Sequence, residues 1–166
     1  MSTTFTEENN MEVEYGSLKT LTVLTFIGSG LGFLSSLWQY FSIEKNLAKM
    51  EETVAGPDFN KMPDFVKKMY SPEMIAMTRK IVENKLSITL LAVIASVLCI
   101  YGAIEMRKLK MNGYFLYLIG SVLPIISTLI FIGIQALSGF AGIMTLVITV
   151  LFIILYTTQR KYLINK

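Results

Sequence analysis

The chain alternates between long apolar runs and shorter polar segments. Four apolar runs cover residues 18–43, 86–106, 113–134 and 139–157. Each is long enough to cross the roughly 30 Å hydrocarbon core of a bilayer as a helix of about 20 residues. The connections that follow the second and third runs are short, which makes successive helices antiparallel neighbours. The pattern therefore predicts an all-α fold, a bundle of four transmembrane helices.

The segment before the first run is polar and acidic. Residues 1–17 contain Glu7, Glu8, Glu12 and Glu14 and show no apolar periodicity, so we expect a mobile tail. An acidic tail ahead of a full-length apolar run is unlike a cleavable signal peptide, which needs a basic start and a short apolar stretch. The predicted parts are therefore this tail and a membrane domain over residues 18–166.

The connection between the first two runs, residues 44–85, is long and holds most of the charge. Ile43, Leu47, Met50 and Val54 recur at helical spacing at its start. The first transmembrane helix should therefore continue beyond the membrane until the pair Gly56-Pro57 ends it.

A second helix is expected in the latter half of the connection. Ser71-Pro72-Glu73 provides an N-cap, a proline at the first helical position and an acid in the first turn, and the helical pattern then continues into the second run. We expect the two extensions to pack together as an extramembrane helical hairpin, with a short helix over residues 63–70. Its contact surface is predicted to consist of Leu47, Met50, Met74 and Met77.

Basic residues indicate the orientation in the membrane, and the aromatic residues fit either orientation. Seven of the 15 basic residues lie on the side of the termini and eight lie in residues 44–85, where seven acidic residues offset them. The short connection between the second and third runs carries three basic residues and the next connection carries none, so we expect both termini in the cytoplasm. Interfacial aromatic anchors are predicted at Trp38, Tyr40 and Phe41 on one side and at Tyr114, Tyr117, Tyr156 and Tyr162 on the other.

The composition excludes several classes of function. Hydrophobic residues make up 53% of the chain and charged residues 16%, whereas soluble domains have about 45–50% and about 25%. There is no histidine, which removes the usual general base and the commonest metal ligand, and Cys99 lies in an apolar run without a second cysteine. A net charge of +3 is too small to indicate nucleic-acid binding. We expect no catalysis, cofactor or metal site.

Small residues form strips along two of the predicted helices. Such strips let another helix approach closely, and in a membrane this replaces the absent hydrophobic driving force between helices. They can serve packing within the bundle or contact with a partner or second copy. The strips are Gly28, Gly32 and Ser36 in the first helix and Ala95, Cys99 and Ala103 in the second.

Glu105 is the main ionisable residue inside a predicted span. Charged groups in spans are costly and commonly functional. Since Arg107 and Lys108 follow closely, we expect an interfacial carboxylate held by an ion pair, with a ligand-binding carboxylate as the alternative.

Taken together, the four spans and the basic-aromatic segment Arg107–Tyr117 resemble those of small four-span membrane proteins of bacteria, a resemblance that implies no activity. We expect an integral membrane protein of the bacterial inner membrane that contacts the lipid bilayer and other membrane subunits or itself. Its predicted role is that of a non-catalytic accessory, assembly or scaffolding subunit. The alternative is a small homo-oligomeric channel or passive transporter, lined by the hydroxyl-bearing face of the first helix that includes Ser29 and Ser35.

Overall fold

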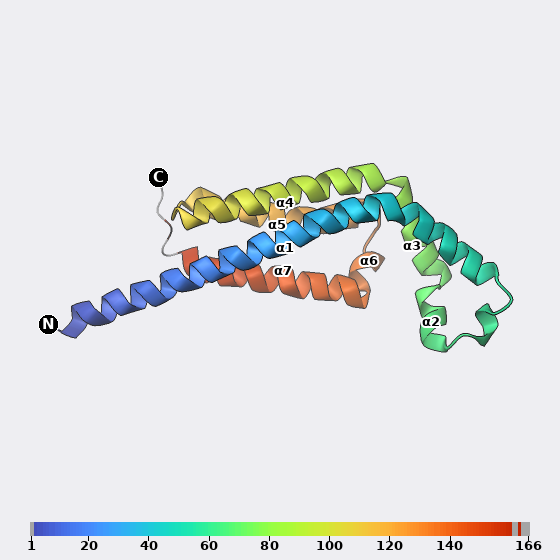
Figure 1. The fold of residues 1–166 in the computed structure, drawn as a ribbon, viewed down its shortest axis with the longest axis horizontal. Helices are drawn as coiled ribbons and strands as arrows, with labels where there is room; N and C mark the ends of the chain where they lie inside the picture. The colour runs from blue at the N-terminus through green and yellow to red at the C-terminus, as the bar shows by residue number, and fades with distance from the viewer. Residues whose placement is uncertain (1, 161–162, 164–166) are drawn as a thin grey trace.

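The computed structural model describes residues 2–160 and Leu163, with the backbone alone for residues 2–15. Helices account for 89% of it, and the described part of the chain contains no strand. Four helices are long and apolar enough to cross a membrane, judged by length and composition (Figure 1). They are α1 (Ser2–Ala55), α4 (Lys85–Arg107), α5 (Met111–Phe131) and α7 (Phe140–Gln159). The predicted all-helical class with four long apolar helices is confirmed.

Helix α1 is longer than the first apolar run. It begins at Ser2, so the backbone of residues 2–17 is helical and continuous with the span, whereas the sequence pattern indicated no regular structure there. The mobility of this acidic segment stays a prediction, and Met1 lies outside the described residues. The helix ends at Ala55, directly before the predicted break at Gly56-Pro57.

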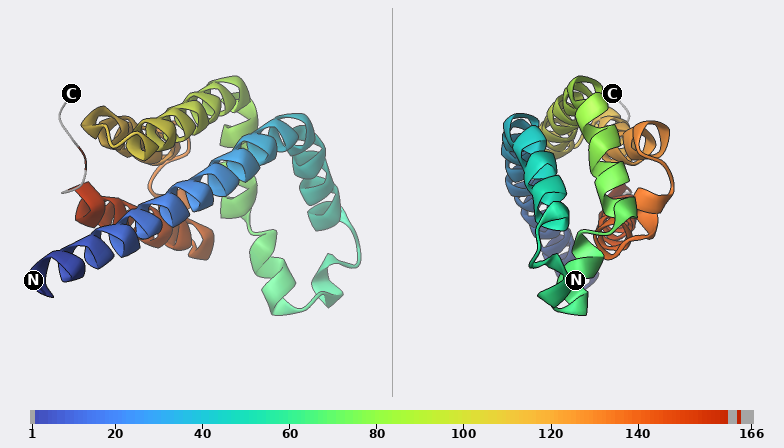
Figure 2. Two further views of the ribbon diagram at one scale, coloured as in Figure 1. Left: turned by 60° about the vertical axis from the view of Figure 1, so that its left-hand side comes forward. Right: turned by 90° about the vertical axis from the view of Figure 1, so that its right-hand side faces the viewer.

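Three short elements occupy the connection from α1 to α4. They are η1 (Phe59–Lys61), α2 (Asp64–Met69) and α3 (Pro72–Glu83). Helix α3 begins as predicted, because the Ser71 side chain accepts a hydrogen bond from the backbone N–H of Met74 at 3.3 Å. In Figures 1 and 2, α3 lies beside the last part of α1, which bends away from the long axis of the molecule.

The expected continuous helix from α3 into the second span is wrong. Asn84 interrupts it with φ −110° and ψ 15°, and α4 starts at Lys85 in a new direction (Figure 1). The Asn84 side-chain amide donates to the carbonyl of Lys80 at 3.0 Å. Asparagine competes in this way for backbone groups that a regular helix uses, which favours a break at this residue.

The third apolar run also divides differently from the prediction of residues 113–134. Helix α5 ends at Phe131, and Gly133 has a φ of +109° while its N–H donates to the carbonyl of Thr128 at 3.0 Å. Glycine adopts this left-handed conformation without a Cβ penalty, so it closes the helix end. The short helix α6 (Gln135–Ser138) then leads to α7.

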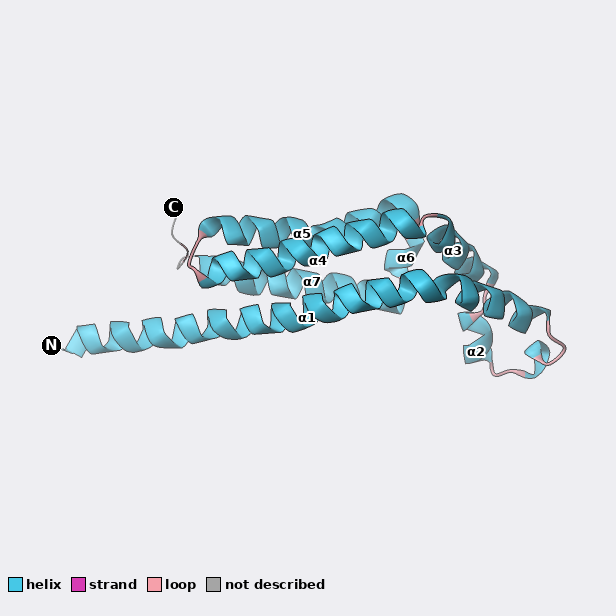
Figure 3. Cartoon of the chain, turned by 45° about the horizontal axis from the view of Figure 1, so that its top comes forward, coloured by secondary structure: helices cyan, strands magenta, loops and turns pink. Residues whose placement is uncertain are grey.

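The buried core lies toward one end of the four long helices. The antiparallel pair α4–α5 and the helices α1 and α7 all contribute to it, at the end of α4 where α5 begins (Figure 3). Elsewhere large apolar side chains face outward, such as Trp38, which is 76% exposed, and Phe140, which is 84% exposed. An outward apolar surface on helices of this length suits a hydrocarbon environment. The core residues are Leu18, Leu21, Cys99, Met106, Tyr114, Tyr117, Tyr156 and Leu163.

Candidate functional site

Helices α4 and α5 approach each other through glycine. A Cβ built on Gly113 would lie 2.5 Å from the backbone nitrogen of Met106 and 2.6 Å from the carbonyl oxygen of Gly102. A Cβ built on Gly120 would lie 2.9 Å from the carbonyl oxygen of Ala95. Atoms of real side chains do not approach backbone so closely, so this helix contact requires glycine at these positions.

The small-residue strip predicted on α4 lies within this contact. Ala95, Cys99 and Ala103 are all buried, and the Cys99 thiol points to the carbonyl of Tyr117 on α5 at 4.0 Å. The strip therefore lies in a contact between two helices of the same chain, α4 and α5. The sequence reasoning missed the matching glycines on α5, although the seven-residue spacing of Gly113 and Gly120 was a signal for one helix face.

A buried polar and aromatic cluster joins the four long helices. The hydroxyl groups of Thr25 on α1 and Tyr156 on α7 are 2.7 Å apart, and these residues are 5% and 0% exposed. The ring of Tyr156 packs against that of Tyr117 on α5, with 4.4 Å between centroids. Cys99 of α4 completes the cluster through its contact with Tyr117. Because each hydroxyl in the Thr25–Tyr156 pair has a partner, the pair satisfies its own hydrogen-bonding needs in an apolar interior.

Three predicted interfacial anchors take a different place in the structure. Tyr114, Tyr117 and Tyr156 are buried in the core, and Tyr114 pairs its hydroxyl with Thr157 at 2.9 Å. Tyrosine suits both settings because its apolar ring carries one polar group. The sequence pattern could not distinguish a tyrosine at the membrane interface from a tyrosine in the core, since both lie near the end of a span. Tyr162, the fourth predicted anchor, lies outside the described residues.

Glu105 lies at the turn between α4 and α5. Its side chain is 9% exposed and receives hydrogen bonds from Lys108 at 3.0 Å and from Lys110 at 2.9 Å. The turn brings Lys110 back to this carboxylate, since Leu109 has a φ of 60° and the Lys110 N–H donates to the Glu105 carbonyl. Arg107, which the sequence suggested as a partner, instead lies over the ring of Phe26 on α1, 5.7 Å from its centroid.

The ion pair also affects the titration of Lys110, which lies between the two spans. The hydrogen bond to Glu105, and next the charge of that carboxylate, raise the pKa of Lys110 above its ordinary value of 10.5. A raised pKa in the folded state means that the stabilisation is fully present below the ordinary pKa and is lost as pH rises through the folded pKa. The ion pair therefore does not make the protein pH-sensitive in the neutral range.

The two glycines of the small-residue strip predicted on α1 are not packed against another helix of the chain, whereas Ser36 lines a small cavity together with Thr89 and Ala92 of α4. Gly28 and Gly32 are exposed, and a Cβ built on either would meet no atom within 4 Å. Ser36 is half-buried, and its hydroxyl donates to the carbonyl of Phe33 at 2.8 Å. The structure does not bring the three residues together into one contact. Gly32 lies seven residues from Thr25 and therefore on nearly the same face of α1, the face that contacts Tyr156.

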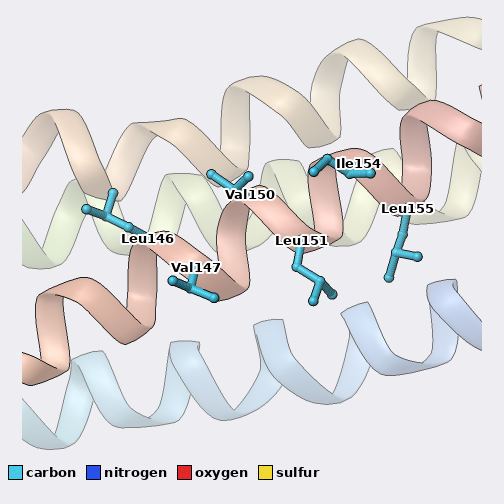
Figure 4. Close-up of a pocket in the computed structure, with 6 residues that line it drawn as sticks. All are labelled: Leu146, Val147, Val150, Leu151, Ile154 and Leu155. Atoms are coloured by element: carbon cyan, nitrogen blue, oxygen red, sulfur yellow. The ribbon is translucent and has the colours of Figure 1, made fainter.

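Helix α7 presents an apolar groove of about 560 Å³. Figure 4 shows Val147, Leu151 and Leu155 projecting from α7 toward α1, and the other lining residues pointing away from it. The groove has almost no polar surface and lies within the span, so a lipid chain or an apolar helix is chemically suited to it. The remaining lining residues are Leu146, Val150 and Ile154.

The predicted contact surface of the long connection is only partly buried. Leu47, Met50 and Met77 are half-buried, and Met74 is exposed. One contact between α1 and α3 here is a weak hydrogen bond from Thr78 to the sulfur of Met50 at 3.8 Å. Ion pairs join the same region: Arg79 with Glu51 at 2.6 Å, and Lys85 with Glu44.

The described residues contain no group of three or more histidine, cysteine, aspartate or glutamate side chains that could hold a metal ion. The predicted site residues are divided between a buried strip on α4, two exposed glycines on α1, the α4–α5 turn and the contact between α1 and α3.

No family model, no curated protein and no solved structure matches this chain.

Proposed function

We propose that this protein is a non-catalytic accessory, assembly or scaffolding subunit of a larger membrane complex in the bacterial inner membrane. In this proposal the four apolar helices form a transmembrane bundle, and the end of α1 with α2 and α3 forms an extramembrane hairpin. The partner is another membrane subunit that lies against α1.

The observation that carries the proposal is the open strip at Gly28 and Gly32. Glycine costs helix stability, roughly 1 kcal/mol relative to alanine, so two exposed glycines four residues apart need a compensating gain. Close approach of a partner helix supplies that gain through dispersion and weak backbone contacts. The exposed side chain of Gln39 near the end of the span would supply a hydrogen bond to the same partner.

We expect Gly32→Leu to release the partner while leaving the protein inserted and folded. The leucine side chain would fill the space that the partner backbone needs, and a Cβ at this position meets no atom of the chain itself within 4 Å. The measurement is a mild-detergent pull-down of tagged protein from native membranes at native abundance, with the stoichiometry of the co-eluting subunits. Gly30→Leu is the matched control, because it makes the same change two positions away on another face of α1, where a Cβ also meets no atom within 4 Å.

Three results would count against the proposal. Retention of the partner by Gly32→Leu would remove the strip as the docking surface, and equal loss in Gly30→Leu would indicate general damage to α1. Elution of the wild-type protein alone as a discrete homo-oligomer would favour the channel function, which Ser29→Leu and Ser35→Leu should then impair in a liposome flux assay.

We also propose that both termini are cytoplasmic, with residues 56–84 outside. A membrane-impermeant maleimide should label Asp58→Cys in intact cells, and should label Asn112→Cys only after permeabilisation. Cys99 is buried, so it gives little background. The reverse pattern of labelling would invert the topology.

A further inference from the structure

The α4–α5 turn concentrates positive charge at one end of the membrane-spanning helices. Arg107, Lys108 and Lys110 stand against one acid, Glu105, so the turn has a net charge of +2. Helix α4 has 23 residues, a length of about 34 Å, which slightly exceeds the hydrocarbon thickness of about 30 Å. Both ends of α4 therefore reach the level of the lipid headgroups.

The basic residues of the turn are not equivalent. Glu105 accepts hydrogen bonds from both Lys108 and Lys110, so its charge is shared between those two ammonium groups. Within the described residues Arg107 forms no ion pair, and its guanidinium is held over the Phe26 ring of α1. That contact restricts the side chain, and because Arg107 is exposed its planar donors remain accessible to other acceptors.

The opposite end of the molecule has a different charge arrangement. There Arg79 pairs with Glu51 and Lys85 pairs with Glu44. Lys61 also pairs with Asp58. These three cations have protein carboxylates as partners, whereas the one acid of the α4–α5 turn, Glu105, is shared by two of its three bases. Among the described side chains, no acid other than Glu105 forms an ion pair at the α4–α5 turn.

We propose that the α4–α5 turn binds the phosphate headgroup of an anionic phospholipid, with Arg107 as its principal contact. A guanidinium forms two parallel hydrogen bonds with a phosphate, and the headgroup layer places phosphate at the depth of Arg107. The proposal is independent of the accessory role, because it concerns the lipid and a different surface.

The test measures the preference of the purified full-length protein for phosphatidylglycerol over phosphatidylcholine. The protein is held in nanodiscs of pure phosphatidylcholine or of phosphatidylcholine with one-fifth phosphatidylglycerol, and bound lipid is counted by native mass spectrometry. We expect Arg107→Gln to lower the affinity for phosphatidylglycerol about fivefold, the effect of one basic residue at a membrane surface. Arg107→Lys should keep most of the preference because it keeps the charge.

Arg79→Gln is the matched control, since it removes one arginine charge at the opposite end, where Glu51 already pairs with it. If Arg107→Gln does not fold, Lys110→Gln provides a second test at the same turn, with a smaller loss expected because Lys110 shares its charge with Glu105. An unchanged preference in Arg107→Gln, or an equal loss in Arg79→Gln, would overturn the proposal. So would equal binding of soluble glycerol phosphate, since that would assign the site to free phosphate.

Discussion

Gly113→Ala is expected to destabilise the folded protein by about 3 kcal/mol, the upper part of the range for overpacked sites. The added methyl group would lie 2.5 Å from the backbone nitrogen of Met106 and 2.6 Å from the carbonyl oxygen of Gly102. Backbone atoms in two packed helices cannot move aside as a flexible side chain can. The helices α4 and α5 would have to separate, and the contacts along their length would weaken together.

The measurement is unfolding of micelle-solubilised protein by increasing dodecyl sulfate, followed by circular dichroism. Gly28→Ala is the control, because the same methyl group there meets no atom within 4 Å. Alanine has the higher helix propensity, so the control should be neutral or slightly stabilising when the protein is alone. Equal stability of Gly113→Ala and the wild-type protein would show that α4 and α5 are not in close contact.

Tyr156→Ala is expected to cost about 3–5 kcal/mol, the range found when a large buried aromatic side chain is removed. Tyr156 is fully buried, packs against Tyr117 and pairs its hydroxyl with Thr25. Its removal would leave a cavity where α1, α5 and α7 meet and would also leave the Thr25 hydroxyl without this partner. The same dodecyl sulfate titration measures the loss.

Tyr156→Phe separates the hydrogen bond from the packing. We expect a loss of about 0.6 kcal/mol, with an upper limit near 1.7 kcal/mol, as found for side-chain hydrogen bonds between membrane helices. In a double-mutant cycle with Thr25→Val, the two changes should be less than additive because they remove the same bond. Fully additive losses would show that Thr25 and Tyr156 do not interact.

Much of the fold could be predicted because a membrane imposes simple requirements on sequence. Runs of about 20 apolar residues mark the spans, since backbone groups in hydrocarbon must be satisfied within a helix. The break at Gly56-Pro57 and the N-cap at Ser71 are local effects of residue type, and the structure has both. The break at Asn84 is also a local effect of residue type. It was not predicted, because the apolar helical pattern continues across Asn84 into the second span.

The site was harder to predict because it depends on which helix faces are paired. The spacing of Ala95, Cys99 and Ala103 identified a strip of small residues, as did the spacing of Gly28 and Gly32. The spacing of residues along one helix does not show which helix lies against them. For both strips the sequence therefore left two interpretations, packing within the bundle and contact with a partner or second copy. The fold packs the first against α5 and leaves the two glycines of α1 exposed.

The sequence by itself determined the helical class, the number of apolar helices and the positions of several helix ends, because these depend on local composition and on the solvent properties of a bilayer. Only the tertiary structure decided that Tyr117 and Tyr156 are core residues, that Lys110 returns to Glu105 and that Arg107 lies over Phe26. These contacts join residues from different helices or across a turn. They depend on helix rotation and on backbone approach at glycine, which no single helix specifies.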